Sequence, residues 1–177
     1  MSAASPTPWT RGAKGKWAPL MVGISDLAKN TGDWHVAQAG MLLTQLQLLE
    51  FNARLGIARR TGSPKLDLHN ISAGEWVPEN PITNYDQLKT VLTRFNELAP
   101  ERGHLDVEAL VELRDQLAHG RVIPFSSTAA FPLILLKLGP SRRGRVQLLT
   151  RIEMNADWFT EKRQLLDRAI NTVGLWA

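Results

Sequence analysis

Arg114 and His119 are the two side chains of this 177-residue chain whose types and spacing are best suited to chemistry on a phosphate group. They stand five positions apart in the run LRDQLAHG, at the end of a helix that is predicted to begin after Asp106. A guanidinium binds phosphate oxygens through two parallel hydrogen bonds, and an imidazole takes up and releases a proton near neutral pH. The pair therefore suggests a site that binds a phosphate group and transfers a proton.

The predicted helix places Arg114 among apolar residues. At about 100° per residue, Arg114 lies near the middle of the stripe formed by Val107, Leu110, Val111, Leu117 and Ala118. A buried, unpaired guanidinium is costly, so Arg114 must reach solvent, pair with an acid or face an anion. Four acids predicted to lie on other helices are candidate partners: Asp33, Glu50, Glu97 and Asp157. An internal pair would make Arg114 structural, whereas an open face would let it bind a ligand.

His119 also has two interpretations. It lies about 140° around the helix from Arg114, so the two side chains need a second chain or a frayed last turn to converge. It stands one turn after Asp115 and at a helix end, where the dipole favours a cation. This environment suits proton transfer, with Asp115 either orienting the imidazole or repelling a phosphate. It equally suits a histidine that only caps the last carbonyl groups.

The segment from Arg121 to Arg151 contains six basic residues and no acid. Since the whole chain has 21 basic and 17 acidic residues, the remainder is slightly acidic and the basic pI of 9.8 depends on this segment. Concentrated positive charge attracts polyanions, which predicts that the segment contacts RNA. The residues expected to do so are Arg121, Arg142, Arg143 and Arg145. Alternatively, these charges only protect the edge of a sheet from association.

Hydrophobic spacing predicts four helices, with short β-strands between the third and the fourth. The helices are expected at Asp33 to about Arg60, from a capping signal at Asn84 and Gln87 to about Ala99, from Val107 to Gly120, and after Asn155. The strands are expected at 122–125, 133–138 and 146–152. Asp106 and Asn155 have the offsets of N-caps, and Gly120 is expected to end its helix in the left-handed conformation.

The run from Leu113 to Gly120 resembles the R-x4-H signature of the HEPN superfamily of small helical domains. In that signature a polar residue usually follows the arginine, and Ala-His-Gly is a frequent ending. Together with the element order, the resemblance implies a mostly α fold, a four-helix up-and-down bundle with a small antiparallel β insert between the third and fourth helices. That domain would span residues 21–177, with the insert at about 121–152, after a flexible basic arm at residues 1–20.

The resemblance further implies a metal-independent endoribonuclease that acts as a homodimer, with the arginine and histidine of both protomers in one cleft. Carried onto this chain, Arg114 would neutralise the scissile phosphate and His119 would move protons at the 2′-hydroxyl or the leaving 5′-oxygen. Asp115, the third candidate catalytic residue, stands where the family more often has Asn. A toxin-like or defence role, with an antitoxin or another protein as partner, is a further expectation.

Two other functions remain open at this stage. One is a HEPN-like domain that binds a nucleotide or a protein partner without catalysis. The other is a structural helical protein whose Arg114 is paired internally and whose His119 only caps its helix. Fold resemblance does not separate these possibilities, because catalytic and non-catalytic domains share a fold.

Composition excludes several classes of site. The chain has no cysteine, so disulfides, cysteine-bound metals and thiol nucleophiles are excluded. The isolated His35, His69 and His104 lack metal-ligand spacing, so neither a metal nor a cofactor is expected. No apolar run of 18 residues or secretory signal is present, which predicts a cytoplasmic protein without membrane contact. Trp76 could stack on a base, and Glu50 with Arg54 is spaced for an ion pair within one helix.

Overall fold

The computed structural model describes residues 9–11, 17–19, 32–67, 70–124 and 133–176. Within the expected N-terminal arm, strands β1 (Trp9–Arg11) and β2 (Trp17–Pro19) pair antiparallel. The other residues of the arm, residues 20–31 at the expected domain boundary, His69 and Phe125 lie outside the described residues.

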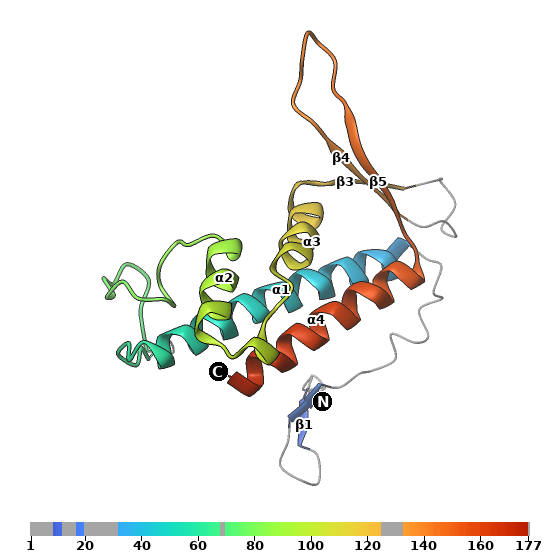
Figure 1. The fold of residues 1–177 in the computed structure, drawn as a ribbon. Coiled ribbons are helices and arrows are strands. Elements are labelled where there is room, and N and C mark those ends of the chain that lie inside the picture. The colour runs from blue at the N-terminus through green and yellow to red at the C-terminus, as the bar shows by residue number, and fades with distance from the viewer. Residues whose placement is uncertain (1–8, 12–16, 20–31, 68–69, 125–132, 177) are drawn as a thin grey trace, which may run out of the picture.

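The two longest helices, α1 (Gly32–Arg60) and α4 (Ala156–Trp176), lie side by side and run in the same direction (Figure 1). Near their starts, the rings of Trp34 and Phe159 meet edge to face at 5.4 Å between centroids. At their ends, Arg60 Nη2 donates to the carbonyl oxygen of Trp176 at 2.8 Å. Apolar residues of both helices form the centre of the core, among them Leu42, Leu49, Leu166 and Val173.

This parallel pair differs from the expected up-and-down order. In a simple up-and-down bundle of four helices, the first and fourth are antiparallel neighbours. Here the sheet that follows α3 carries the chain back to the end of the molecule at which α1 begins, and α4 therefore starts beside the start of α1 (Figure 1).

Helices α2 (Leu88–Leu98) and α3 (Val107–His119) form an antiparallel hairpin that crosses the long pair (Figure 1). A short 3-10 turn, η2 (Glu101–Gly103), joins them. The predicted cap of α3 is confirmed, because Asp106 Oδ1 accepts from the backbone N–H of Ala109 at 3.1 Å. The predicted cap of α4 is also confirmed, because Asn155 Oδ1 accepts from the N–H of Trp158 at 2.9 Å.

The sheet consists of β3 (Arg121–Pro124), β4 (Leu133–Leu138) and β5 (Leu148–Met154), antiparallel and in that order. The strand expected at 133–138 is confirmed. The strand expected at 122–125 begins one residue earlier, at Arg121, and the strand expected at 146–152 begins two residues later, at Leu148. Beyond β3, the β4–β5 hairpin continues as a two-stranded arm that projects from the helices (Figure 1). We call residues 136–151 the ribbon; its foot is the pair Leu136 and Arg151.

Gly120, between α3 and β3, does not adopt the expected left-handed conformation. Its φ of −70° and ψ of 147° are extended, because the chain passes directly from the helix into the strand. A Cβ at this position would lie 2.2 Å from the carbonyl oxygen of Gln116 and 2.9 Å from Cγ of Leu135. The position therefore requires glycine because α3 and β4 approach closely, not because of backbone handedness.

The fold is thus mostly helical with a small antiparallel sheet between α3 and α4, as the sequence predicts. Among the helices in the described ranges, none is both long and apolar enough to cross a membrane.

Candidate functional site

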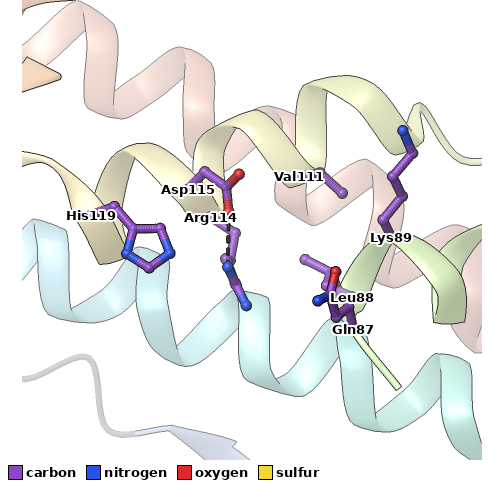
Figure 2. Close-up of a pocket in the computed structure, with 7 residues that line it drawn as sticks. All are labelled: Gln87, Leu88, Lys89, Val111, Arg114, Asp115 and His119. Atoms are coloured by element: carbon purple, nitrogen blue, oxygen red, sulfur yellow. Dashed lines mark hydrogen bonds and ion pairs between the residues drawn. The ribbon is translucent and has the colours of Figure 1, made fainter. Parts of the chain in front are cut away.

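A pocket of about 590 Å³ lies between the start of α2 and the second half of α3. The antiparallel arrangement of these helices brings the first residues of α2 beside the last turns of α3. Seven residues line the pocket (Figure 2): Gln87, Leu88, Lys89, Val111, Arg114, Asp115 and His119. The three candidate catalytic residues are therefore brought together in one chain.

Arg114 and His119 line the same pocket of a single chain, without a second chain and without a frayed last turn. Val111, Asp115 and His119 follow one another at intervals of four residues and form one ridge of α3, with Arg114 on the next ridge. The pocket spans both ridges, and the Arg114–Asp115 pair lies between His119 on one side and the start of α2 on the other (Figure 2).

Arg114 does not lie in the middle of the buried face of α3. The buried residues of this helix are Leu110, Leu113 and Gln116, whereas Val111 is only half-buried and Ala118 is exposed. The helix is rotated relative to the expected stripe, since Leu113 and Gln116 are buried, Val111 packs against the core only in part, and Ala118 is exposed. The side chain of Arg114 is 41% exposed and is accessible to a ligand.

The partner of Arg114 is its neighbour in the sequence. Arg114 Nη1 donates to Asp115 Oδ1 at 2.8 Å, so in the described contacts the acid comes from α3 and not from Glu50, Glu97 or Asp157, while the side chain of Asp33 lies outside the described part of the chain. An exposed ion pair contributes only about 0.2–1 kcal/mol, so a phosphate can displace this carboxylate at small cost. Among the described residues, no hydrogen bond joins Asp115 to His119, which leaves the expected orienting role without support.

His119 is the last residue of α3 and is exposed. At this helix end the backbone N–H of Gly120 donates to the carbonyl oxygen of Gln116 at 2.9 Å. In the described part of the chain, no hydrogen bond joins the imidazole to the last carbonyl groups, which disfavours the capping interpretation. The imidazole faces the pocket and is available to exchange protons with a ligand (Figure 2).

The start of α2 contributes residues that the sequence analysis missed. The N-cap is Gln87, whose side chain makes no capping hydrogen bond, and the first turn contains no acid. The N–H groups of such a turn carry partial positive charge, and Lys89 adds a full charge beside them. No local signal marks Lys89, because its place in the pocket depends on how α2 and α3 pair.

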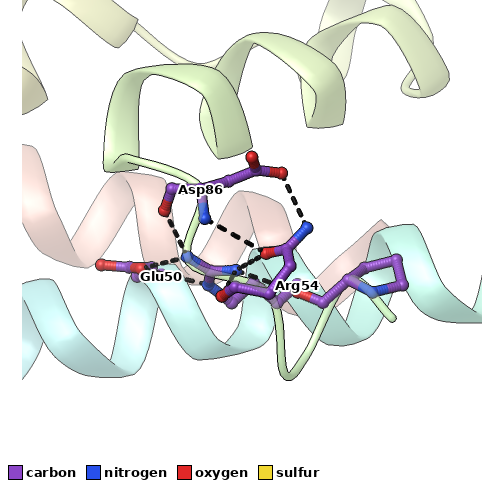
Figure 3. Close-up of polar contacts among 5 residues, drawn as sticks. Glu50, Arg54 and Asp86 are labelled. Carbon is purple, nitrogen blue, oxygen red and sulfur yellow. Dashed lines mark hydrogen bonds and ion pairs between the residues drawn. The ribbon is translucent and has the colours of Figure 1, made fainter. Parts of the chain in front are cut away.

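A buried arginine holds the segment that leads into α2 (Figure 3). Arg54 on α1 is 8% exposed and donates to Glu50 Oε1 at 2.7 Å, which confirms the predicted ion pair. Its guanidinium also donates to the carbonyl oxygens of Pro81 at 3.0 Å, Asn84 at 3.2 Å and Asp86 at 2.6 Å. Arg54 therefore fixes the chain immediately before the pocket and acts as a positioning residue.

Asn84 is not the N-cap of α2, contrary to the prediction. Its side-chain oxygen accepts a hydrogen bond from Arg54, and its amide nitrogen donates to Asp86 Oδ2 at 2.7 Å. The helix begins later because this network holds residues 81–86 outside the helical conformation (Figure 3).

The four arginines expected to contact RNA lie in two places. Arg121 is exposed at the start of β3, two residues after His119. Arg142, Arg143 and Arg145 are exposed at the end of the ribbon, away from the pocket. A second hollow of about 290 Å³ occurs there, lined by Pro140, Arg142, Arg145, Val146 and Gln147.

Trp76 is fully exposed, but its surroundings do not favour a nucleic acid. The hollow beside it, of about 350 Å³, is also lined by Glu75 and Glu79. Carboxylates that line the same hollow repel a phosphate backbone, so the charge around Trp76 does not favour stacking of a nucleic acid base on its ring.

Within the described ranges, no three His, Asp or Glu side chains are grouped so that they could hold a metal ion. Comparison of the chain with protein-family models, curated proteins and solved structures finds no match. The pocket therefore has to be interpreted from its own residues.

Proposed function

We propose that this protein is a metal-independent endoribonuclease of HEPN type, with the α2–α3 pocket as its active site. The observation that carries the proposal is that Arg114 and His119 line one open pocket, with Lys89 and the uncapped start of α2 opposite them. A guanidinium and an imidazole that line one pocket are suited to binding and proton transfer at a ribose-phosphate linkage, and the start of α2 adds positive charge at the far end of the pocket. The R-x4-H resemblance supports the same assignment.

In this mechanism the cationic groups hold the scissile phosphate and His119 acts as the base. Arg114 exchanges Asp115 for an oxygen of the scissile phosphate, and Lys89 adds positive charge on the α2 side of the pocket. The imidazole accepts the proton of the 2′-hydroxyl, the 2′-oxygen bonds to phosphorus, and the bond from phosphorus to the 5′-oxygen breaks. The products are a 2′,3′-cyclic phosphate and a 5′-hydroxyl end.

The leaving 5′-oxygen requires a proton, and the pocket of one chain contains a single histidine. A homodimer would supply the second imidazole, and we include it in the proposal. The face of α3 that would meet the second copy is uncovered, since Ala118 and His119 are exposed and Val111 is half-buried. Light scattering on the purified chain tests this step, with a mass of two chains as the expected result.

The proposal is tested by incubating the protein with RNA in excess EDTA and analysing the ends of the products. Fragments with 2′,3′-cyclic phosphate and 5′-hydroxyl ends are expected at an undiminished rate, because no step uses a metal ion. Cleavage that stops on chelation, or products with 5′-phosphate ends, would exclude this mechanism.

A second candidate function is binding of a nucleotide without catalysis. The pocket volume of about 590 Å³ favours it, because pockets for small ligands measure about 300–1,000 Å³. In that case Arg114→Ala would abolish nucleotide binding, while His119→Ala would change no measured activity.

A further inference from the structure

The ribbon is an exposed arm with an unusual charge. Its residues from 140 to 149 are all exposed. It contains five basic residues and no acid: Lys137, Arg142, Arg143, Arg145 and Arg151. In the described part of the chain, Arg151 pairs with Glu153 at 3.0 Å, whereas Arg142, Arg143 and Arg145 have no acidic partner. The end of the ribbon therefore carries three uncompensated cations.

The turn at the end of the ribbon holds these arginines in a defined arrangement. The N–H of Arg142 donates to the carbonyl of Arg145 at 2.7 Å, and the N–H of Arg145 donates back at 3.0 Å. The two central residues, Arg143 and Gly144, have φ angles of 51° and 73°, which is a type I′ hairpin turn. A left-handed conformation is unfavourable for arginine, and strain of this kind is concentrated at functional sites.

The hollow at this turn has the chemistry of a sugar-phosphate site. Arg142 and Arg145 provide guanidinium groups and Gln147 provides an amide, while Pro140 and Val146 provide apolar surface. Guanidinium groups bind phosphate oxygens, and the apolar side chains suit the carbon face of a ribose. The volume of about 290 Å³ accommodates one such unit.

The foot of the ribbon pairs with a strand that begins two residues after the pocket residue His119. Arg121, two residues after His119, pairs with Leu136, which in turn pairs with Arg151. Arg142 is six residues beyond Leu136, which corresponds to about 20 Å of strand. A nucleic acid strand advances about 3.4 Å per nucleotide when stacked, so this span corresponds to about six nucleotides.

From these observations we infer that the end of the ribbon is a second RNA-contact site, which holds the backbone about six nucleotides beyond the foot of the ribbon and therefore at least that far from the bond in the pocket. The inference rests on the proposed function, and it specifies the substrate as an RNA strand rather than a mononucleotide or dinucleotide. Arg121 and Arg151 lie between the two sites, so the intervening phosphates pass cationic groups.

The test measures equilibrium binding of two single-stranded oligoribonucleotides, of about 4 and about 14 nucleotides, chosen so that only the longer spans both sites. Binding is measured in a His119→Ala background, so that cleavage does not interfere. The ribbon variant carries Arg142→Gln, Arg143→Gln and Arg145→Gln. The matched control removes three exposed positive charges elsewhere, through Lys65→Gln, Arg94→Gln and Arg168→Gln.

The ribbon variant is expected to bind the longer strand at least about tenfold more weakly, with a salt dependence reduced by about 2 in log–log slope, since each lost contact accounts for about 0.7. The ribbon variant should bind the shorter strand as tightly as its parent does. The control variant should bind both strands with the affinity and salt dependence of the parent. Equal affinity of the ribbon variant and its parent for the longer strand would overturn the inference. A changed mass of the RNA-free protein, with unchanged RNA affinity, would also overturn it and assign the ribbon to an interface between copies.

Cleavage and binding measurements together distinguish failure of the proposed nuclease function from failure of the ribbon site. If the unmutated chain cleaves no RNA but the ribbon variant still loses affinity for the longer strand, the ribbon site stands and the nuclease is excluded. If cleavage depends on His119 but the ribbon variant binds normally, only the ribbon site is excluded.

Discussion

Arg114 and Asp115 form an ion pair of 2.8 Å in the pocket, so the cation that is proposed to hold phosphate already has an anionic partner. Both side chains are partly exposed, at 41% and 36%, and the pair is therefore weak enough to exchange. The carboxylate competes with phosphate for the same guanidinium. Asp115 is therefore expected to limit the affinity of the pocket for anions.

Substitution Asp115→Asn is expected to strengthen RNA binding by about two- to fivefold, because the competing ion pair is worth up to about 1 kcal/mol. Affinity is measured in the His119→Ala background, with Asp157→Asn as the control for loss of one exposed negative charge on α4. Unchanged or weaker binding in the Asp115 variant would show that the carboxylate does not compete with the ligand.

Arg54→Met is expected to impair the pocket without touching the ligand. The change leaves the carbonyl oxygens of Pro81, Asn84 and Asp86 without their donor and releases the start of α2. Displacement of a binding wall by about 1 Å is sufficient to change activity by one or two orders of magnitude, so a rise in KM of about tenfold or more is predicted. The fraction folded is measured in parallel by circular dichroism.

Arg60→Met is the matched control for Arg54. Arg60 also donates to backbone carbonyl groups, those of Leu98 and Trp176, but at the other end of α2. The Arg60→Met protein should have a lower melting temperature. At assay temperatures below that melting temperature, its KM should be unchanged. Equal effects of the two variants on KM would mean that Arg54 acts through global stability and not through the position of α2.

Gly120→Ala is expected to destabilise the fold by about 1–3 kcal/mol, because its Cβ would overlap the carbonyl of Gln116 and the side chain of Leu135. Gly40→Ala on α1 has the opposite expected sign, a gain of about 0.5–1 kcal/mol, since nothing lies within 4 Å of the added Cβ. Denaturant unfolding measures both. An unchanged free energy of unfolding in the Gly120→Ala variant would contradict the close approach of α3 and β4.

The sequence predicts the features that depend on local chemistry. The caps at Asp106 and Asn155 follow from side chains that bind backbone groups three residues away, and both are confirmed. The pair Glu50 and Arg54 follows from helical spacing and is also confirmed. The spacing of apolar residues likewise predicts the four helices and the strand at 133–138.

The features that depend on tertiary packing could not be predicted. Asn84 has a capping sequence, but the competing donor is Arg54, about thirty residues away on another helix. The rotation of α3 is set by its packing, so periodicity alone placed Arg114 too deeply. The parallel direction of α1 and α4 depends on where the sheet returns the chain, which no local pattern records.

The most direct test of the central claim is the single-turnover rate of RNA cleavage in EDTA by two histidine variants. His119→Ala removes the proposed base from the pocket, and His104→Ala removes another exposed histidine that lies outside it. The account predicts a loss of about 10²–10⁴-fold for the first variant, the usual contribution of a general base, and an unchanged rate for the second. Cleavage by the His119 variant at the rate of the unmutated protein would contradict the assignment of this pocket as the active site.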